Sequence, residues 1–548
     1  MDSLPPAFFH IAIYFWMINT ETSHDRRNVM FDEINLFDNK NRDLRWCFLF
    51  FFVVAICSYL SLMVSFCPYN DDICRYLVNS NVGTFAYNRV FTFLIETFVY
   101  LSNVITDAAP LSHVLACAFL AYGAVICLKI FNVNPNSKLE VACFIPIVAN
   151  PYMLEIMMFR FDNPFSALAL LFYIVAAYVS TENSQKLLFI QTVIFFLSLF
   201  MYQPASSVYF ILGTYKFLEE IRAGKSFSQT ISKMRYWLYT VLISVIAYIP
   251  FTYLFNYHVA EDGSMLALPF NIQNVDIILK NVGTYYSNLY TDWSQNTAGI
   301  LFFFIFFISV LYSVTKIKKF SSVFIYVLGV FVLTLCPLGA STALKTLVCN
   351  ETIPPRSLYS MGILISGVLY GACELFKISN QAFTFYGFVV TSLCTWSAIF
   401  LNSAGNIIHS LRLLQRHVLY DIAKDIHEVR EKNKNLSGFC CTGNLQTYSM
   451  NKFAELYPMV YRIIPEQWYV PTMCQIALID YKFADSFTKY FPVDKFFEKD
   501  KYKNKNLVKS HALYDVFILD GKVIHINFKS DRKFKVKDIN YAKIGNEH

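Results

Sequence analysis

The sequence predicts an all-α polytopic membrane protein that ends in a C-terminal extracytoplasmic soluble α/β domain. Two observations carry this prediction. Of the 548 residues, 55% are hydrophobic and only 16% are charged, whereas soluble globular proteins carry about 25% charged residues. Apolar runs near the ~20-residue length that a membrane-crossing helix needs recur from Trp46 to about residue 402 and then cease. The same composition excludes disorder, a coiled coil and a basic nucleic-acid-binding domain.

The apolar runs divide the chain into three regions. Residues 1–45 form a cytoplasmic N-terminal segment, 46–402 a multi-span membrane domain, and 403–548 an outward C-terminal domain without a further span. We expect about eleven spans, at 46–66, 111–131, 141–158, 164–180, 187–201, 203–217, 237–256, 299–315, 320–338, 358–376 and 382–402. The run from Val90 to Ile105 contains polar residues such as Glu96, so we expect it to be a helix on the membrane surface.

Lysine and arginine gather in four segments that eleven spans place on one side of the membrane. These residues are Arg26, Arg27, Lys40, Arg42 and Arg45; Lys216, Arg222, Lys225, Lys233 and Arg235; Lys316, Lys318 and Lys319; and Lys377. The positive-inside rule makes that side the cytoplasm. The acidic loop 257–298 then faces outward, together with the loop 67–110, the turns near 159–163 and 201–203, and the loop 339–357.

The 14 cysteines are scattered, and no two have the CxxC spacing of a zinc or redox site. Eight of them lie in or beside apolar runs, and we expect these to be small core residues. They are Cys47, Cys57, Cys117, Cys127, Cys143, Cys336, Cys373 and Cys394.

Adjacent carboxylates, Asp71 and Asp72, follow the first span, with Arg75 close by. Neighbouring carboxylates repel each other, which raises the pKa of one and suits it to proton transfer. The alternative interpretation is a solvated loop or a helix N-cap. A divalent metal held by the pair stays open as well, although we identify no further ligand of suitable type.

A second polar cluster, Arg160-Phe-Asp-Asn-Pro164, separates the third and fourth spans. Charges at a membrane edge are costly and therefore indicate function. Arg160 can bind a phosphate, and Asp162 can orient it or accept a hydrogen bond from a hydroxyl. The alternative is an interfacial ion pair in which Asp162 caps the helix that begins near Pro164.

Two further turns carry candidate substrate-binding residues. Tyr202 and Gln203, before Pro204, can line a sugar site, although Pro204 also has the plain role of starting a helix. Arg356 precedes a span, where its charge adds to the positive helix end and suits a lipid-linked phosphate. An arginine that merely reaches the lipid headgroups is the alternative.

All four clusters fall on the outward face, which is the geometry for a reaction between a lipid-carried donor and an external acceptor. No phosphate-binding loop, GxGxxG, HExxH or GxSxG motif occurs in a fitting context, which argues against a cytoplasmic nucleotide-sugar enzyme.

These motifs resemble a known family. An acidic pair in the first outward loop, followed by many spans, is similar to the GT-C fold of polyprenyl-phosphate-sugar-dependent glycosyltransferases. Tyr69-Asn-Asp-Asp72 with Arg75, Arg160-Phe-Asp-Asn-Pro164 and Tyr202-Gln-Pro204 resemble the phage-encoded, serotype-converting O-antigen glucosyltransferases of the Gtr type II group. The resemblance covers roughly residues 46–402.

The resemblance implies a multi-pass enzyme of the bacterial inner membrane whose active site and C-terminus are periplasmic. It would transfer glucose from undecaprenyl-phosphate-glucose to lipopolysaccharide O-antigen and so convert the serotype. A flippase and a separate donor synthase would be its functional partners, membrane lipid would surround it, and nucleic acid would not be a ligand. We assign no cofactor, with the divalent metal left open.

By the same resemblance, Asp71 or Asp72 would be the general base of an inverting transfer, and the choice between them stays open. The substrate-binding residues would be Arg75, Arg160, Asp162, Tyr202, Gln203 and Arg356. Of these, Arg160 and Arg356 would neutralise the departing lipid phosphate, while Asp162, Tyr202 and Gln203 would hold the sugar.

Rival functions differ in features that the sequence displays. A transporter or flippase predicts internal repeats and midplane charges, and we find no repeat. An O-antigen polymerase more typically has a large central outward loop, whereas another lipid-linked-sugar transferase shares almost every feature above. For the C-terminal domain, an acceptor-binding module and a solvated stabilising domain are both open.

Overall fold

The computed structural model describes residues 33–36, 38–65, 72, 89–100, 106–182, 184–255, 272–343, 353–433, 435–436, 438–442, 448–463 and 504–529. Of the predicted site residues, Asp71 and Arg75 lie outside these ranges, as does the N-terminal segment up to residue 32.

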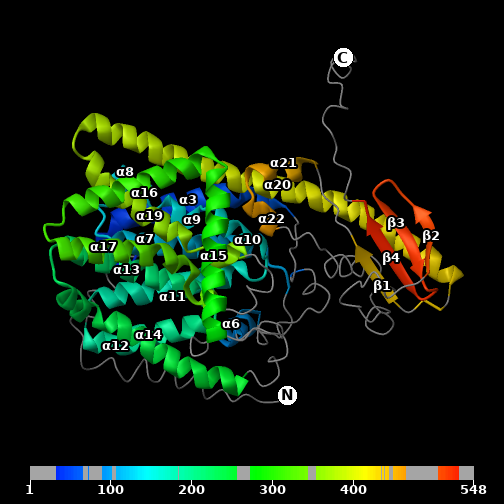
Figure 1. Ribbon diagram of the computed structural model, residues 1–548, viewed down its shortest axis with the longest axis horizontal. Coiled ribbons are helices and arrows are strands. Elements are labelled where there is room, and N and C mark those ends of the chain that lie inside the picture. The colour runs from blue at the N-terminus through cyan, green and yellow to red at the C-terminus, as the bar shows by residue number, and fades with distance from the viewer. Residues whose placement is uncertain are drawn as a thin grey trace, which may run out of the picture.

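A bundle of helices forms the larger part of the molecule (Figure 1). Its long members are α3 (Arg42–Val64), α7 (Leu111–Ile130), α11 (Asn163–Thr181), α12 (Gln185–Leu199), α13 (Ser207–Arg222), α14 (Phe227–Phe255), α16 (Thr297–Thr315), α17 (Phe320–Leu335), α19 (Met361–Phe376) and α20 (Asn380–Lys432). A broken helix adds α8 (Lys138–Ala142), α9 (Ile145–Val148), η2 (Pro151–Met153) and α10 (Leu154–Met158).

Each of the eleven predicted spans coincides with one of these helices or with the broken helix. By length and composition, eight candidate spans qualify within the described residues. The shorter α12 and α19 are apolar, and α13 has 16 residues. The bundle is thus compatible with a multi-pass membrane protein.

The helix α3 shows how one apolar sequence serves two environments. Phe51, Ala55 and Tyr59 are fully buried against the bundle, while Val53 and Leu60 are about half exposed. A helix that is apolar all round but buries one face suits contact with lipid on the other. Seven of the eight cysteines expected in the core are buried as predicted. The prediction was wrong for Cys57, which is exposed, because the helical period places it on the face of α3 that points away from the bundle.

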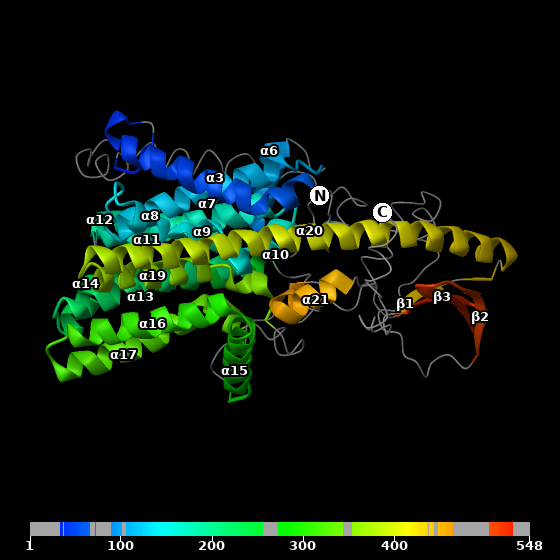
Figure 2. The same cartoon turned by 90° about the horizontal axis from the view of Figure 1, so that it is seen from above.

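The helices alternate in direction, so their connections gather at two ends of the bundle. One end carries α6 (Val90–Tyr100), η3 (Gln203–Ser206), η5 (Cys336–Ala343) and η6 (Pro355–Leu358). The helix α15 (Ile272–Ser294) runs across the direction of the bundle helices there (Figure 2), and we call this end the α15 end. The described basic segments, predicted from the charge pattern to share one side, all lie at the opposite end.

Prolines break the helix between Lys138 and Met158 into short pieces. Pro146 lies in the first turn of α9 and Pro151 in that of η2, where neither residue needs to donate a backbone hydrogen bond. The helix α19 packs closely on this segment, because a side chain at Gly362 would collide with the carbonyl oxygen of Pro146. The breaks set the position of α10 and of the turn that follows it.

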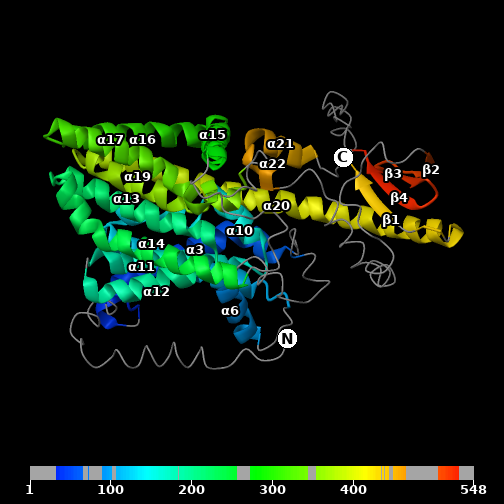
Figure 3. The same cartoon turned by 60° about the horizontal axis from the view of Figure 1, so that its bottom comes forward.

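The helix α20 continues without a break through residue 402 and leaves the bundle at the α15 end (Figure 3). A four-stranded sheet packs on its distal part, with strands β1 (Gly438–Thr442), β2 (Lys505–Ser510), β3 (Tyr514–Leu519) and β4 (Val523–Phe528) in the order β1-β4-β3-β2. Strand β1 runs parallel to β4, and the other pairs are antiparallel. The expected combination of helix and sheet is therefore present in this part of the chain.

Apolar and polar contacts both hold the sheet on α20. Ile422 and Ile426 pack against a sheet face that includes Ile524. At its border, Asp425 accepts hydrogen bonds from Lys509 Nζ at 2.6 Å and from the Tyr514 hydroxyl at 2.8 Å. The helices α21 (Tyr448–Leu456) and α22 (Met459–Ile463) return toward the bundle, where α21 packs on α20 and α22 on η6.

The stability of the sheet should fall in mild acid because of His525. This residue is buried on β4, and burial, followed by the nearby charge of Lys505, lowers its pKa to about 4. An unfolded histidine titrates near pH 6.5, so acidification from about pH 6.5 to 4 protonates the unfolded chain first and costs up to about 3 kcal/mol.

Hydrogen exchange of peptides spanning 514–528, corrected for intrinsic rates, should show protection falling over that pH range in the full chain. His525→Asn should flatten the dependence, and the exposed-site control His427→Gln should retain it. Equal pH dependence in His525→Asn would contradict the assignment.

Candidate active site

The buried guanidinium of Arg160 joins three segments at the α15 end. Its Nε donates to Asp107 Oδ2 and one terminal nitrogen donates to the carbonyl oxygen of Ser65, each at 2.8 Å. The backbone nitrogen of Arg160 donates to Oδ2 of Asp72, also at 2.8 Å. Asp72 is fully buried. The end of α3, the segment before α7 and the turn before α11 therefore meet at one residue.

Asp162 lies on the same turn and pairs with Arg89 instead of capping a helix. Arg89 approaches Asp162 Oδ2 at 3.5 Å, and the Asp162 side chain makes no cap hydrogen bond to α11. The Arg89 guanidinium also lies 5.0 Å from the centre of the Tyr202 ring, a cation–π contact. Asp162 and Tyr202, more than thirty residues apart in the chain, are thus linked through one arginine.

Tyr202 connects this cluster to Arg356. Its hydroxyl donates to the carbonyl oxygen of Arg356 at 3.4 Å, and its ring contacts the Tyr359 ring edge-on at 5.6 Å. Glu155 of α10 then fixes Arg356 twice, accepting from its backbone nitrogen at 2.8 Å and approaching its guanidinium at 3.4 Å. The Arg356 guanidinium also lies over the ring of Phe159.

The structure therefore brings five of the predicted site residues into one contact network: Asp72, Arg160, Asp162, Tyr202 and Arg356. Gln203 is adjacent in the chain, but its amide donates to the Tyr248 hydroxyl on α14 at 3.0 Å. Asp71 and Arg75, outside the described residues, are not placed.

Three members of the network were missed by sequence reasoning: Arg89, Asp107 and Glu155. Glu155 could have been found, because a carboxylate inside the apolar run 141–158 is costly for the same reason as Arg160. Arg89 and Asp107 lie in the long loop between spans, where a single charge in the sequence carries no such signal.

Exposure separates the three arginines by what each can do. The side chain of Arg160 is 7% exposed and already bonded to protein oxygens, so it holds segments together. The side chains of Arg89 and Arg356 are 24% and 38% exposed. These two present oriented positive charge at the α15 end, which suits an anionic group that arrives from the membrane edge.

The described residues contain no group of three or more His, Cys, Asp or Glu that could hold a metal ion. In the network, Asp107 faces the guanidinium of Arg160, whereas Asp72 accepts from its backbone nitrogen.

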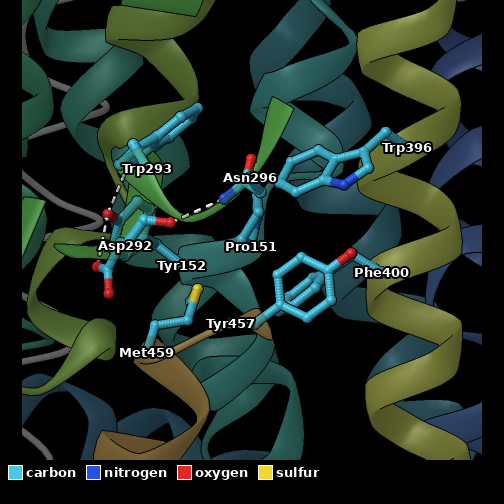
Figure 4. Close-up of a pocket in the computed structure, with 9 residues that line it drawn as sticks. All are labelled: Pro151, Tyr152, Asp292, Trp293, Asn296, Trp396, Phe400, Tyr457 and Met459. Carbon is cyan, nitrogen blue, oxygen red and sulfur yellow. Dashed lines mark hydrogen bonds between the residues drawn. The ribbon is translucent and has the colours of Figure 1, made fainter. Parts of the chain in front are cut away.

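A shallow pocket opens beside the network (Figure 4). It is lined by Pro151, Tyr152, Asp292, Trp293, Asn296, Trp396, Phe400, Tyr457 and Met459. The hydroxyl of Tyr152 donates to Asp292 Oδ2 at 2.9 Å and accepts from the indole nitrogen of Trp293 at 2.9 Å. Tyr152 lies on η2, which continues directly into α10, so the same segment contributes to this pocket and carries Glu155.

Comparison with known proteins identifies the family. The family model for Glucosyl transferase GtrII matches residues 60–370, more than half of the chain and a range that contains the whole network. No curated protein and no solved structure matches the chain. The chain therefore belongs to the GtrII glucosyl transferase family and is a glycosyltransferase.

Proposed function

We propose that this enzyme transfers a glucosyl group from undecaprenyl-phosphate-glucose to the O-antigen of lipopolysaccharide at the periplasmic face of the bacterial inner membrane. The observation that carries the proposal is the network of Asp72, Arg160, Asp162, Tyr202 and Arg356 at one end of an apolar bundle. A reaction between a membrane-bound phosphate donor and an external acceptor needs charged residues at such an end of the bundle. The identification of the transferred sugar as glucose comes from the family.

The transfer proceeds as one displacement. Asp72, or its neighbour Asp71, takes the proton of an acceptor hydroxyl, and the oxygen attacks the anomeric carbon of glucose. The bond from that carbon to the phosphate oxygen breaks, and the lipid phosphate leaves with the electron pair. The configuration inverts. The hydrogen bond from the Arg160 backbone nitrogen fixes the orientation of the Asp72 carboxylate.

Positive charge is needed on the leaving phosphate, because negative charge grows there as the bond breaks. Arg356 is the best-placed cation, since Glu155 orients it and its side chain is the most exposed of the three arginines in the network. Arg89 can assist. Arg160, expected from the sequence to share this role, also holds Asp72 through its backbone nitrogen. Asp162, Tyr202 and Gln203 would contact the sugar, and Arg75 remains a proposed substrate contact.

The donor chemistry also implies partners. Undecaprenyl-phosphate-glucose made at the cytoplasmic face needs a synthase and then a flippase before this enzyme can use it. Both partnerships are part of the proposal. The basic segments at the end opposite α15 support a cytoplasmic position for that end.

Replacement of the general base should nearly abolish transfer. We expect Asp72→Asn or Asp71→Asn, whichever removes the base, to lower the rate by about 10²–10⁴-fold, because general-base catalysis contributes that much. Mass spectrometry of O-antigen after reaction with the purified donor measures the rate. Asp421→Asn, an exposed site on α20, is the control. Full activity in both active-site variants would eliminate the base assignment.

Neutralising Arg356 should weaken use of the donor. We expect Arg356→Gln to lower kcat/KM for undecaprenyl-phosphate-glucose about ten- to a hundredfold, the value of a hydrogen bond to a charged group, with the acceptor KM little changed. Arg356→Lys, which keeps the positive charge, should impair use of the donor less than Arg356→Gln does. Arg235→Gln, exposed on α14, controls for charge alone. A rise confined to the acceptor KM would refute the phosphate role.

The two ends of the bundle should lie on opposite sides of the membrane. Alkaline phosphatase fused after Asn433, beyond the end of α20, should be active in the periplasm, whereas a fusion after Lys225 should be inactive. A fluorescent reporter that folds only in the cytoplasm should give the reverse pattern at the same sites. The opposite result for the Asn433 fusion would overturn the periplasmic placement of the network.

A further inference from the structure

The short helix α22 reaches the α15 end from outside the family-matched range. Its Arg462 forms an ion pair with Asp292 of α15, and the two side chains are only 11% and 3% exposed. These residues are 170 positions apart in the chain. Removing a pair of charges from water to this degree is costly unless each partner is compensated, and breaking such a pair leaves a buried charge unpaired.

Arg462 favours the charged form of Asp292. Burial raises the pKa of Asp292, and the guanidinium of Arg462 opposes that shift. The contacts converge on Oδ2, which receives Arg462 and the Tyr152 hydroxyl. Within the described ranges, Oδ1 has no hydrogen-bond partner. Without Arg462, the buried Asp292 carboxylate would keep only one neutral hydrogen-bond donor among these contacts, the Tyr152 hydroxyl.

The pair is connected to the phosphate-binding side of the network by two short routes. Tyr152 lies on η2, which runs directly into α10 and thus to Glu155, the residue that orients Arg356. In addition, α22 packs on η6, which carries Arg356 itself, and η6 packs on both η2 and α10. The position of Arg356 is therefore bounded on one side by α10 and on the other by α22.

We propose that Arg462 is a positioning residue for the donor phosphate site: through Asp292 and Tyr152 it holds α10 and η6 in register, so that Glu155 can orient Arg356. This inference rests on the proposed function. It adds a residue beyond the family-matched range to the machinery of transfer, although Arg462 contacts no substrate itself.

The test compares neutral, conservative and compensated variants of the full chain in membranes. Arg462→Met keeps the apolar stem but strands the Asp292 carboxylate, and we expect the donor KM to rise at least about tenfold, since small misplacements of a binding group are costly. The acceptor KM should stay unchanged. Arg462→Lys keeps the charge, and its donor KM should lie between those of Arg462→Met and the wild type.

The double variant Asp292→Asn/Arg462→Met decides whether the buried charge is the cause. The amide can still accept from Tyr152, and no charge is left unpaired, so the donor KM should return to within about threefold of wild type. Lys452→Met on α21 removes a charge from an exposed pair nearby and should leave both KM values unchanged.

Thermal melting of each variant separates positioning from folding. A merely structural role would lower the melting temperature without shifting the donor KM of the folded fraction, and that result would overturn the proposal. So would a double variant as impaired in donor KM as Arg462→Met. If Arg462→Met does not fold, Arg462→Lys and the double variant carry the same comparison. Absence of transfer by the wild-type chain would contradict the proposed function instead.

Discussion

Three segments that are remote in the sequence meet on the buried guanidinium of Arg160. Its donors reach Asp107 and Ser65, and its own backbone nitrogen reaches Asp72. Moving an ion from water into a protein interior costs several kcal/mol even after relaxation, so this cation is tolerated only with its oxygen partners in place. The hydrogen bond from Arg160 to Ser65 therefore holds the turn before α11 against the end of α3. The remaining contacts of the network are built outward from that turn.

Carboxylates and arginines alternate through the network, and this pairing of opposite charges explains how so many charged side chains can lie close together. Asp162 lies against Arg89, and Glu155 lies against Arg356, so each arginine has a carboxylate that orients it. A side chain held in this way would lose little freedom on binding the phosphate of the proposed donor, which is the condition for stabilising charge during bond cleavage. The proline breaks before α10 serve the same end, because they set where Glu155 lies.

Hydropathy predicted the helices well, since the cost of exposing polar backbone to lipid leaves the chain few alternatives within apolar runs. The common location of Asp72, Arg160, Asp162, Tyr202 and Arg356 also followed from counting spans. The pairings did not. Which carboxylate meets Arg160 depends on where Asp107, before α7, lies in space, and no periodic pattern encodes that. The continuation of α20 past residue 402 was missed for another reason: its distal part is amphipathic and ends the apolar signal without ending the helix.

The division of the chain at the end of the family-matched range has a structural counterpart. Every residue of the network lies within the family-matched range 60–370. The continuation of α20 carries the sheet away from the bundle, yet α22 returns and places Arg462 against Asp292. A C-terminal domain joined to the bundle only through the chain would not need a buried ion pair such as Arg462–Asp292. The C-terminal part is thus joined to the α15 end by the same kind of interaction, a buried arginine on a carboxylate, that organises the network itself.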